Sequence, residues 1–150
     1  MRGASPIVVV GPERAVDPEL ADGVVWARED PPGGGPVAGL AAGLALVDND
    51  FVAVLAVDQP GVTASTIDRL RAAADGGGAV LVDADGRRQW LIGVWRVAAL
   101  RAALPARPDG ASLRSVLTPL APAEVAALPG EALDVDTPED LEGWAARPPD

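Results

Sequence analysis

The sequence of 150 residues contains no cysteine and no histidine, and each absence excludes a class of chemistry. Without cysteine, the chain has no disulfide, no thiolate nucleophile and no zinc site built on sulfur. Without histidine as well, a bound metal ion must be a hard cation held by oxygen atoms, so magnesium-type chemistry or none is expected. Aromatic residues make up only 3% of the chain, whereas an all-β protein would be richer in Thr, Tyr and Ile. The abundance of Ala, Val, Leu and Gly favours an α/β protein whose helices pack closely on a Val-rich sheet.

Lysine is absent too, so all twelve basic residues are arginines, and against 22 acidic residues they leave a formal net charge of −10. The arginines are scattered rather than gathered on one stripe, which argues against a nucleic-acid-binding surface. The four apolar residues that follow Pro6 are too few for a signal peptide or a membrane span. We therefore expect a cytoplasmic protein whose partners include neither nucleic acid nor membrane.

The length is that of one ordinary domain with a single core, here residues 1–150. Apolar runs of strand length alternate with helical patterns, and this order predicts a mostly parallel sheet. Asp85-Gly86 lies between two apolar runs and predicts a hairpin, which adds one antiparallel excursion. Thr137-Pro138 followed by two acids predicts the start of the last helix. We expect strands at 7–10, 24–27, 51–57, 79–83, 89–95 and 131–135, and helices at 36–47, 63–74, 96–104, 112–120 and from 137 onward.

Two of these elements lack a polar face. Residues 7–10 form a continuous β-branched run that ends at Gly11-Pro12, which is typical of a buried strand. Residues 36–47 are apolar all round and end at Asp48, so they predict a helix that is buried on most faces.

Three aspartates fall at predicted strand ends or at the entrance of a glycine-rich loop: Asp58, Asp136 and Asp30. In an open parallel sheet, ligands bind outside the carboxyl ends of the strands. Carboxylates of Asp58 and Asp136 converging there would hold one magnesium ion against phosphate oxygens, because this ion takes few protein carboxylates. Each aspartate has an alternative interpretation. Asp58 before Gln-Pro also suits a turn, and Asp136 also suits the helix start, where Asp134 competes for its role.

The loop Gly33-Gly34-Gly35 precedes the apolar helix directly. Glycines at this place expose bare backbone amides, which an anion or a flat ring can approach closely. The same glycines are also compatible with a simple turn, because neither a GxGxxG nor a Walker pattern is present.

Five segments, taken in order, carry a family resemblance: IVVVG (7–11), REDPPGGGPVAGLAAGL (28–44), VLAVDQP (54–60), QWLIGVWRVAALRAAL (89–104) and DVDTPEDL (134–141). They resemble the molybdenum cofactor guanylyltransferases, which belong to the nucleotidyltransferase superfamily. The resemblance covers nearly the whole chain, and its second and third segments are the more specific ones, since DTPEDL is shared with other nucleotidyltransferases. It implies a Rossmann-like α/β fold, with a mostly parallel twisted sheet and helices on both faces.

The resemblance implies a magnesium-dependent enzyme in which the terminal phosphate of molybdopterin attacks the α-phosphate of GTP. The products would be molybdopterin guanine dinucleotide and pyrophosphate, and molybdoenzymes or other cofactor-maturation proteins would be partners. By the same resemblance, Asp58 is the catalytic residue, a magnesium ligand and a nucleotide-binding residue; Asp30 binds the nucleotide, Asp136 binds the metal, and Gly34, Gly35, Pro36 and Gly39 form the substrate loop.

One family segment has no counterpart in the sequence: the loop of the type Gly-Gly-x-Ser-x-Arg-x-Gly-x-Asp-Lys, which grips the triphosphate and guanine. Met1 falls just before the family's second strand, so we expect the coding sequence to begin upstream, with the first strand-loop-helix unit. Gly11 stands where some relatives carry an Asn that touches the nucleotide. Because the base-reading loop is the missing part, two alternatives stay open. One is a cytidylyltransferase or other small-molecule nucleotidyltransferase, and the other is an inactive truncated domain that binds cofactor or a partner protein.

Overall fold

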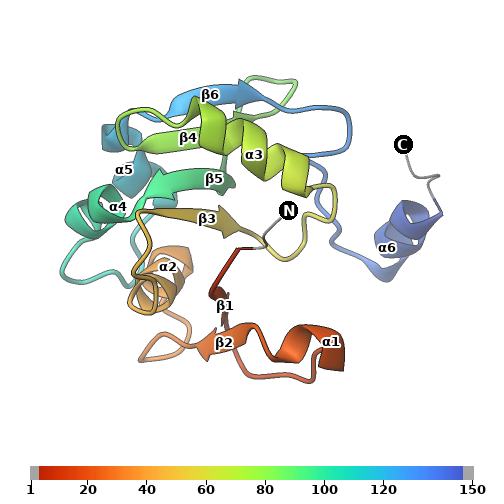
Figure 1. Ribbon diagram of the computed structural model, residues 1–150, viewed down its shortest axis with the longest axis horizontal. Helices are drawn as coiled ribbons and strands as arrows, with labels where there is room; N and C mark the ends of the chain where they lie inside the picture. The colour runs from red at the N-terminus through yellow and green to blue at the C-terminus, as the bar shows by residue number, and fades with distance from the viewer. Residues whose placement is uncertain (1–3, 147–150) are drawn as a thin grey trace. The chain divides into compact units, whose positions relative to one another are not determined.

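The computed structural model describes residues 4–146, apart from the side chain of Leu20, and it has the expected α/β fold (Figure 1). Contacts divide the described chain into two compact units: unit 1 comprises the residues up to Val52 and Val97–Leu120, and unit 2 comprises Ala53–Arg96 and the residues from Ala121 onward. The elements in chain order are β1 (Ile7–Val10), α1 (Pro18–Ala21), β2 (Val24–Ala27), α2 (Pro36–Leu44), β3 (Phe51–Leu55), α3 (Ala64–Ala73), β4 (Gly78–Val82), β5 (Arg88–Arg96), α4 (Val97–Ala103), α5 (Leu113–Leu117), the 3-10 helix η1 (Thr118–Leu120), β6 (Ala123–Ala126) and α6 (Pro138–Ala145). Within residues 4–146, no helix combines the length and the apolar character needed to cross a membrane.

The sheet of unit 1 is the parallel pair of β1 and β2, in which Ile7 lies opposite Val24 and Val10 lies opposite Ala27. The expectation that β1 is a buried strand was wrong, because Ile7 is 44% exposed and Val10 is 40% exposed. Among the described residues, β2 is the only strand that pairs with β1. Strand β1 therefore has a neighbouring strand along one edge only. A continuous apolar run in the sequence does not by itself ensure that both faces of a strand are buried.

Helix α2 packs against β1, and every residue of α2 except Pro36 is buried or half-buried, as its all-round apolar pattern predicted. The helix ends at Leu44, three residues before the expected end. The Arg101 guanidinium of α4 donates hydrogen bonds to the carbonyl oxygens of Leu44 and Val47. These bonds tie the end of α2 and the residues after it to α4, and the Leu44 carbonyl also accepts from the Val47 backbone N–H at 3.2 Å.

Two glycines of α2 face β1 at different distances, and this difference predicts their tolerance to alanine. An added Cβ would lie 3.5 Å from Cγ1 of Val10 at Gly39, an ordinary contact, but only 2.9 Å from Cγ2 of Val10 at Gly43. Both changes gain similar helix propensity, at most about 1 kcal/mol. We therefore expect Gly43→Ala to be less stable than Gly39→Ala by about 1–3 kcal/mol, the usual cost of overpacking. Urea unfolding of the two variants measures the difference, and equal stabilities would contradict the close approach of α2 to β1.

The second sheet has four strands in the order β3-β5-β4-β6. Strands β4 and β6 are parallel, whereas β4 and β5 are antiparallel with a register shift between Val80 and Leu81. Helix α3 contacts β4, β5 and β6 and covers one face of these strands (Figure 1). The antiparallel excursion that the sequence predicted is therefore confirmed.

The turn between β4 and β5 is organised by one carboxylate. Asp83 accepts hydrogen bonds from the backbone N–H groups of Asp85 and Arg87, both at 2.9 Å, and from the side-chain amide of Gln89 at 2.8 Å. The bond from the backbone of Arg87 is the largest of the effects that hold the pKa of Asp83 below its ordinary value, ahead of the bonds from Asp85 and Gln89. The Asp-Gly signal thus marked the hairpin correctly.

Tryptophan contributes to both sheets. Trp95 of β5 is fully buried, and its ring stacks on Trp90 with centroids 6.5 Å apart. The Arg88 guanidinium lies 5.5 Å from the centre of the Trp90 ring, within the range of a cation–π contact. Trp26 lies in β2 of unit 1 and is half-buried.

The last strand lies elsewhere than expected. The prediction of a strand at residues 131–135 was wrong, and β6 at Ala123–Ala126 takes its place beside β4. The physical reason is the burial of Glu131, which is 6% exposed and whose carboxylate is surrounded by hydrogen-bond donors. The hydrogen bonds to these donors hold the residues around Glu131 in a turn, so these residues do not pair as a strand.

Candidate nucleotide and metal site

Asp58 lies in the turn that links β3 to α3, and it is exposed. The turn is anchored at its far end by the helix cap of Thr63. Thr63 accepts a hydrogen bond from the Thr66 backbone N–H at 3.3 Å, and the Thr66 hydroxyl accepts one from the Thr63 backbone N–H at 3.0 Å. Such a reciprocal cap fixes the path of the chain into the helix. Asp58 is thus held between a strand and a capped helix.

The segment that carries Asp136 lies beside this turn. The backbone N–H of Val135 donates to the carbonyl oxygen of Asp58 at 2.8 Å, and the side-chain amide of Gln59 donates to Asp134 at 3.0 Å. The structure therefore brings the segments of Asp58 and Asp136 together within unit 2. The side chain of Asp134 is engaged by Gln59, which separates its role from that of Asp136.

Asp136 stands directly before the cap of α6. Thr137 is the N-cap: its hydroxyl accepts from the Asp140 N–H at 3.2 Å, and Asp140 accepts from the Thr137 N–H at 3.0 Å. The hydrogen bonds from the side chain and backbone of Thr137 are the largest effects that lower the pKa of Asp140. Asp140 serves the cap, whereas Asp136 precedes the cap and is exposed.

The donor set of this region consists of oxygen atoms. Asp58 and Asp136 offer carboxylates, and the side-chain oxygen of Gln59 is buried with no hydrogen-bond partner among the described residues. In residues 4–146, no group of three or more His, Cys, Asp or Glu side chains is gathered to hold a metal ion. Two carboxylates fit magnesium, which commonly takes one or two from the protein and completes its shell with phosphate and water.

The glycine loop belongs to unit 1 and is closed by a side chain. Glu29 accepts a hydrogen bond from the Gly33 backbone N–H at 3.0 Å. The backbone N–H of Glu29 itself and then that of Gly33 are the largest effects that lower the pKa of this carboxyl. Gly35, with φ 90°, is the N-cap of α2, and no side chain caps the helix there, while Pro36 occupies its first turn. The first amides of α2 are therefore not covered by a capping side chain, as an anion-binding loop requires.

A cavity of about 210 Å³ lies beside this loop, and Asp30, Ala38 and Asp109 are among its lining residues. Gly34 accepts a hydrogen bond from the Gly110 backbone N–H at 2.9 Å, so the loop around Asp109 rests on the glycine loop. An added Cβ on Gly34 would lie 2.8 Å from the Ala38 Cβ and would also meet the Asp109 carboxylate. Glycine is thus required at this position for close packing. Sequence analysis missed Asp109, because Pro-Asp-Gly indicates a turn but does not indicate which loop the turn contacts.

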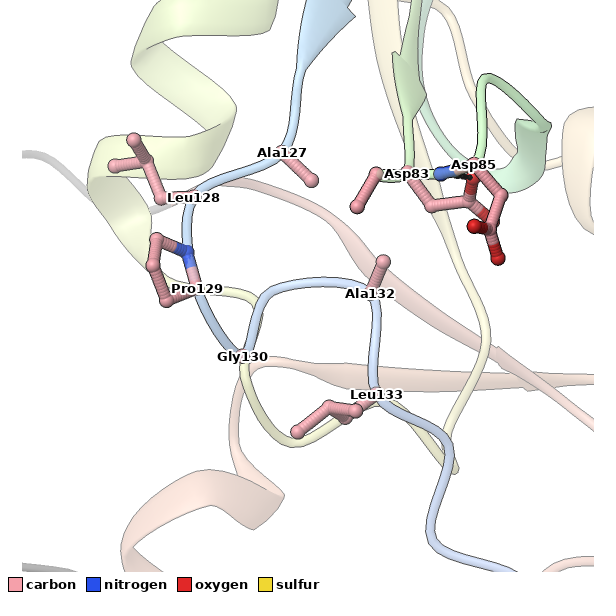
Figure 2. A pocket seen from close by; sticks show the side chains of 9 residues that line it. Asp83, Asp85, Ala127, Leu128, Pro129, Gly130, Ala132 and Leu133 are labelled. Atoms are coloured by element: carbon pink, nitrogen blue, oxygen red, sulfur yellow. Dashed lines mark hydrogen bonds between the residues drawn. The ribbon is translucent and has the colours of Figure 1, made fainter.

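A second cavity, of about 370 Å³, lies in unit 2 at the carboxyl ends of β4 and β6. Figure 2 shows Asp83 and Asp85 on one side of it, while the segment from Ala127 to Leu133 curves around the other side. The Asp85 carboxylate can accept hydrogen bonds from N–H donors, and the side chains of Leu128 and Leu133 offer apolar contact to a flat ring.

The fold is that of the nucleotidyltransferases. The chain is similar to 2-C-methyl-D-erythritol 4-phosphate cytidylyltransferase from Thermus thermophilus, with 22% identity and a TM-score of 0.62 over 93% of this chain and 79% of that one. It is also similar to molybdopterin-guanine dinucleotide biosynthesis protein A from Archaeoglobus fulgidus, with 20% identity and a TM-score of 0.50 over 91% of this chain and 75% of that one. A comparison with curated proteins gave no match.

Residues 1–125 match the model of the MobA-like NTP transferase domain. The chain therefore belongs to this family, and it is a nucleotidyltransferase whose substrates include a nucleoside triphosphate. The expected enzyme class is thus confirmed, whereas the individual roles of Asp30, Asp58, Asp136 and the glycine loop stay predictions.

Proposed function

We propose that the protein transfers GMP from GTP to molybdopterin in a magnesium-dependent reaction and releases pyrophosphate. The observation that supports this proposal is the hydrogen bond from the Val135 N–H to the Asp58 carbonyl, which joins the segments that carry Asp58 and Asp136. The molybdopterin-guanine dinucleotide protein among the structural neighbours supports the choice of this reaction within the family.

The chemistry exchanges one phosphoanhydride bond for another. A terminal phosphate oxygen of molybdopterin bonds to the α-phosphorus of GTP, and the bond between the α-phosphorus and the bridging oxygen to the β-phosphorus breaks. Asp58 and Asp136 would hold the magnesium ion, which supplies neutralisation of the phosphate charges when it is bound. Asp58 would thereby orient the triphosphate for attack, and positioning of this kind supplies most of the catalysis in phosphoryl transfer.

The glycine loop would hold the nucleotide in unit 1. Asp30 lines the cavity beside the loop, and the first amides of α2 lack a capping side chain, so Gly34, Gly35 and Pro36 can lie directly against a ligand. Gly39 continues the same helix at a position where its backbone N–H is already bonded to Gly35. We therefore propose that Gly39 supports the loop through packing.

A cytidylyltransferase is the second candidate, since one structural neighbour carries that activity. Pyrophosphate release from the magnesium complexes of GTP and CTP, each with molybdopterin, separates the two. We expect kcat/KM to be at least about tenfold higher with GTP, a difference of about 1.4 kcal/mol in transition-state binding.

Calorimetry with the same two nucleotides provides the control for this experiment. Binding of magnesium-GTP in the micromolar range corresponds to about −8 kcal/mol. If CTP is preferred in both measurements, the nucleotide substrate is CTP rather than the proposed GTP. Binding without any pyrophosphate release would instead indicate a domain that binds nucleotide without catalysis.

A further inference from the structure

We propose that Glu131 is a positioning residue that clamps the segment after β6 onto α3 and so sets the place of Asp58 relative to the segment of Asp136. Glu131 belongs to none of the sequence segments that indicated the activity, yet its side chain is one of the most buried polar groups of the described chain. The inference rests on the proposed function, because it assigns to Glu131 the support of the turn that would bind magnesium in that reaction.

Both carboxylate oxygens of Glu131 accept hydrogen bonds from α3, and Oε2 also accepts one from the segment of Glu131 itself. Oε1 accepts from the Thr66 hydroxyl at 2.7 Å and from the Arg69 guanidinium at 2.6 Å. Oε2 accepts from the same guanidinium at 3.1 Å and from the backbone N–H of Leu128 at 2.7 Å. Arg69 also donates at 2.9 Å to the carbonyl oxygen of Ala126, the last residue of β6. Four bonds to one carboxylate thus join the turn after β6 to α3, and the bond from Arg69 to Ala126 ties the end of β6 to the same helix.

The clamped residues are adjacent to the candidate metal site on both sides. Thr66 is part of the cap that follows the Asp58 turn, and Glu131 lies four residues before Val135, whose N–H bonds to Asp58. Gly61 of the same turn lies against the backbone of Gly130. Fixing Glu131 on α3 therefore fixes the register between the two segments that carry the acids.

The network needs a carboxylate rather than an amide. Glutamine has the same shape, but one of its two terminal atoms is an NH₂ donor. In either orientation, that NH₂ would face the N–H groups of Arg69 and a second donor, Thr66 or Leu128, instead of accepting from them. Glu131→Gln therefore disrupts the hydrogen-bond network without changing the volume of the side chain.

The titration of Glu131 sets the pH range of the clamp. Burial disfavours its charged form, but hydrogen bonds from Arg69, Thr66 and Leu128 outweigh burial, and the pKa of Glu131 is lowered. A carboxyl with a lowered folded-state pKa stabilises the fold above its unfolded pKa of about 4.3, and this contribution is lost as the pH falls through the folded value. The Glu131→Gln variant has no carboxyl to protonate at this position, so it should not show this loss at low pH. Its free energy of unfolding should therefore depend less on pH below about 4.5.

Hydrogen exchange of the full chain tests the proposal without any need for activity. We expect Glu131→Gln to speed exchange of the Val135 and Leu128 amides by at least about tenfold relative to the β4 amide of Val80, because breaking a buried ion pair from one side is costly. The matched control is Glu124→Gln, which breaks the ion pair with Arg88 at the same 2.6 Å but with both side chains partly exposed. An exposed pair contributes little, so the control should change these ratios by less than about twofold.

The second readout is the magnesium requirement of nucleotidyl transfer. We expect the magnesium concentration for half-maximal rate to rise several-fold in Glu131→Gln and to stay unchanged in Glu124→Gln. If Glu131→Gln does not fold, Arg69→Lys provides the same test, since it keeps the charge but loses the paired bonds to Glu131. Unchanged exchange at Val135, or faster exchange with an unchanged magnesium requirement, would overturn the positioning role. Absence of turnover in the unmodified chain would refute the proposed function, while the exchange ratios would still decide whether the clamp exists.

Discussion

Replacing Asp58 by asparagine is expected to lower the rate of nucleotidyl transfer by about 100- to 1,000-fold, the usual cost of losing one preorganised electrostatic contact to the transition state. Asparagine keeps the shape of the side chain, and the Asp58 carbonyl that accepts from Val135 is part of the backbone, so the turn should persist. What is lost is the negative charge that would hold a divalent cation against the phosphates. We therefore expect the free energy of unfolding to change by less than about 0.5 kcal/mol.

Asp68→Asn is the matched control for this experiment. Asp68 lies on α3 in the same unit and is exposed, so the substitution removes the same charge away from the turn. Pyrophosphate release at saturating magnesium and nucleotide should be nearly unchanged in this variant. Equal losses in the two variants would indicate a general effect of charge, and a loss below about threefold in Asp58→Asn would exclude Asp58 as a metal ligand, since such a loss is under 1 kcal/mol.

The second large effect is expected on stability, from Gly61→Ala. Gly61 is buried, and an added Cβ would overlap the carbonyl oxygen of Gly130 and lie 2.8 Å from its carbonyl carbon and 3.1 Å from the Glu131 Cα. All three are backbone atoms, so none can turn away as a side chain can. The turn after Asp58 and the segment after β6 would have to separate. We expect the free energy of unfolding to fall by at least about 1–3 kcal/mol, the range for overpacking a tight contact.

Gly143→Ala in α6 is the control for Gly61→Ala. An added Cβ there meets no atom within 4 Å, and alanine favours the helix over glycine by at most about 1 kcal/mol. Chemical denaturation followed by circular dichroism should therefore show a loss at Gly61 and none at Gly143. A Gly61→Ala variant as stable as the unmodified chain would refute the close packing of the two loops.

Most elements could be predicted from the sequence because their signals are local. The hairpin between β4 and β5 follows from Asp85-Gly86, and the start of α6 follows from Thr137-Pro138. The short strand β6 was missed, since its Ala-Glu-Val-Ala run contains a single β-branched residue and lies between two prolines. Its strand character comes from pairing with β4, which is a tertiary effect that propensity does not contain.

The site was predictable only where its residues stand at element ends. Asp58 follows from that rule, because it comes shortly after β3, whereas Asp136 follows no strand. The Val135 N–H brings the segment of Asp136 to Asp58 from an irregular stretch of chain, which the argument from strand ends did not foresee. Glu131 was not predictable, because its partner Arg69 lies 62 residues away in the sequence and the ion pair forms only in the folded chain. The same holds for the contact of Gly110 with Gly34. A sequence read on its own therefore identifies acids that can bind a ligand more readily than the residues that hold those acids in place.

The placement of tryptophan gives the chain its own optical reporters. Unit 1 contains a single tryptophan, Trp26, whereas Trp95 is fully buried in unit 2 and stacks on Trp90. A variant that keeps only Trp26 and a variant that keeps only Trp95 would each emit from one unit. Coincident unfolding midpoints from these emissions would mean that the chain melts cooperatively as one domain, and separate midpoints would mean that it melts as two.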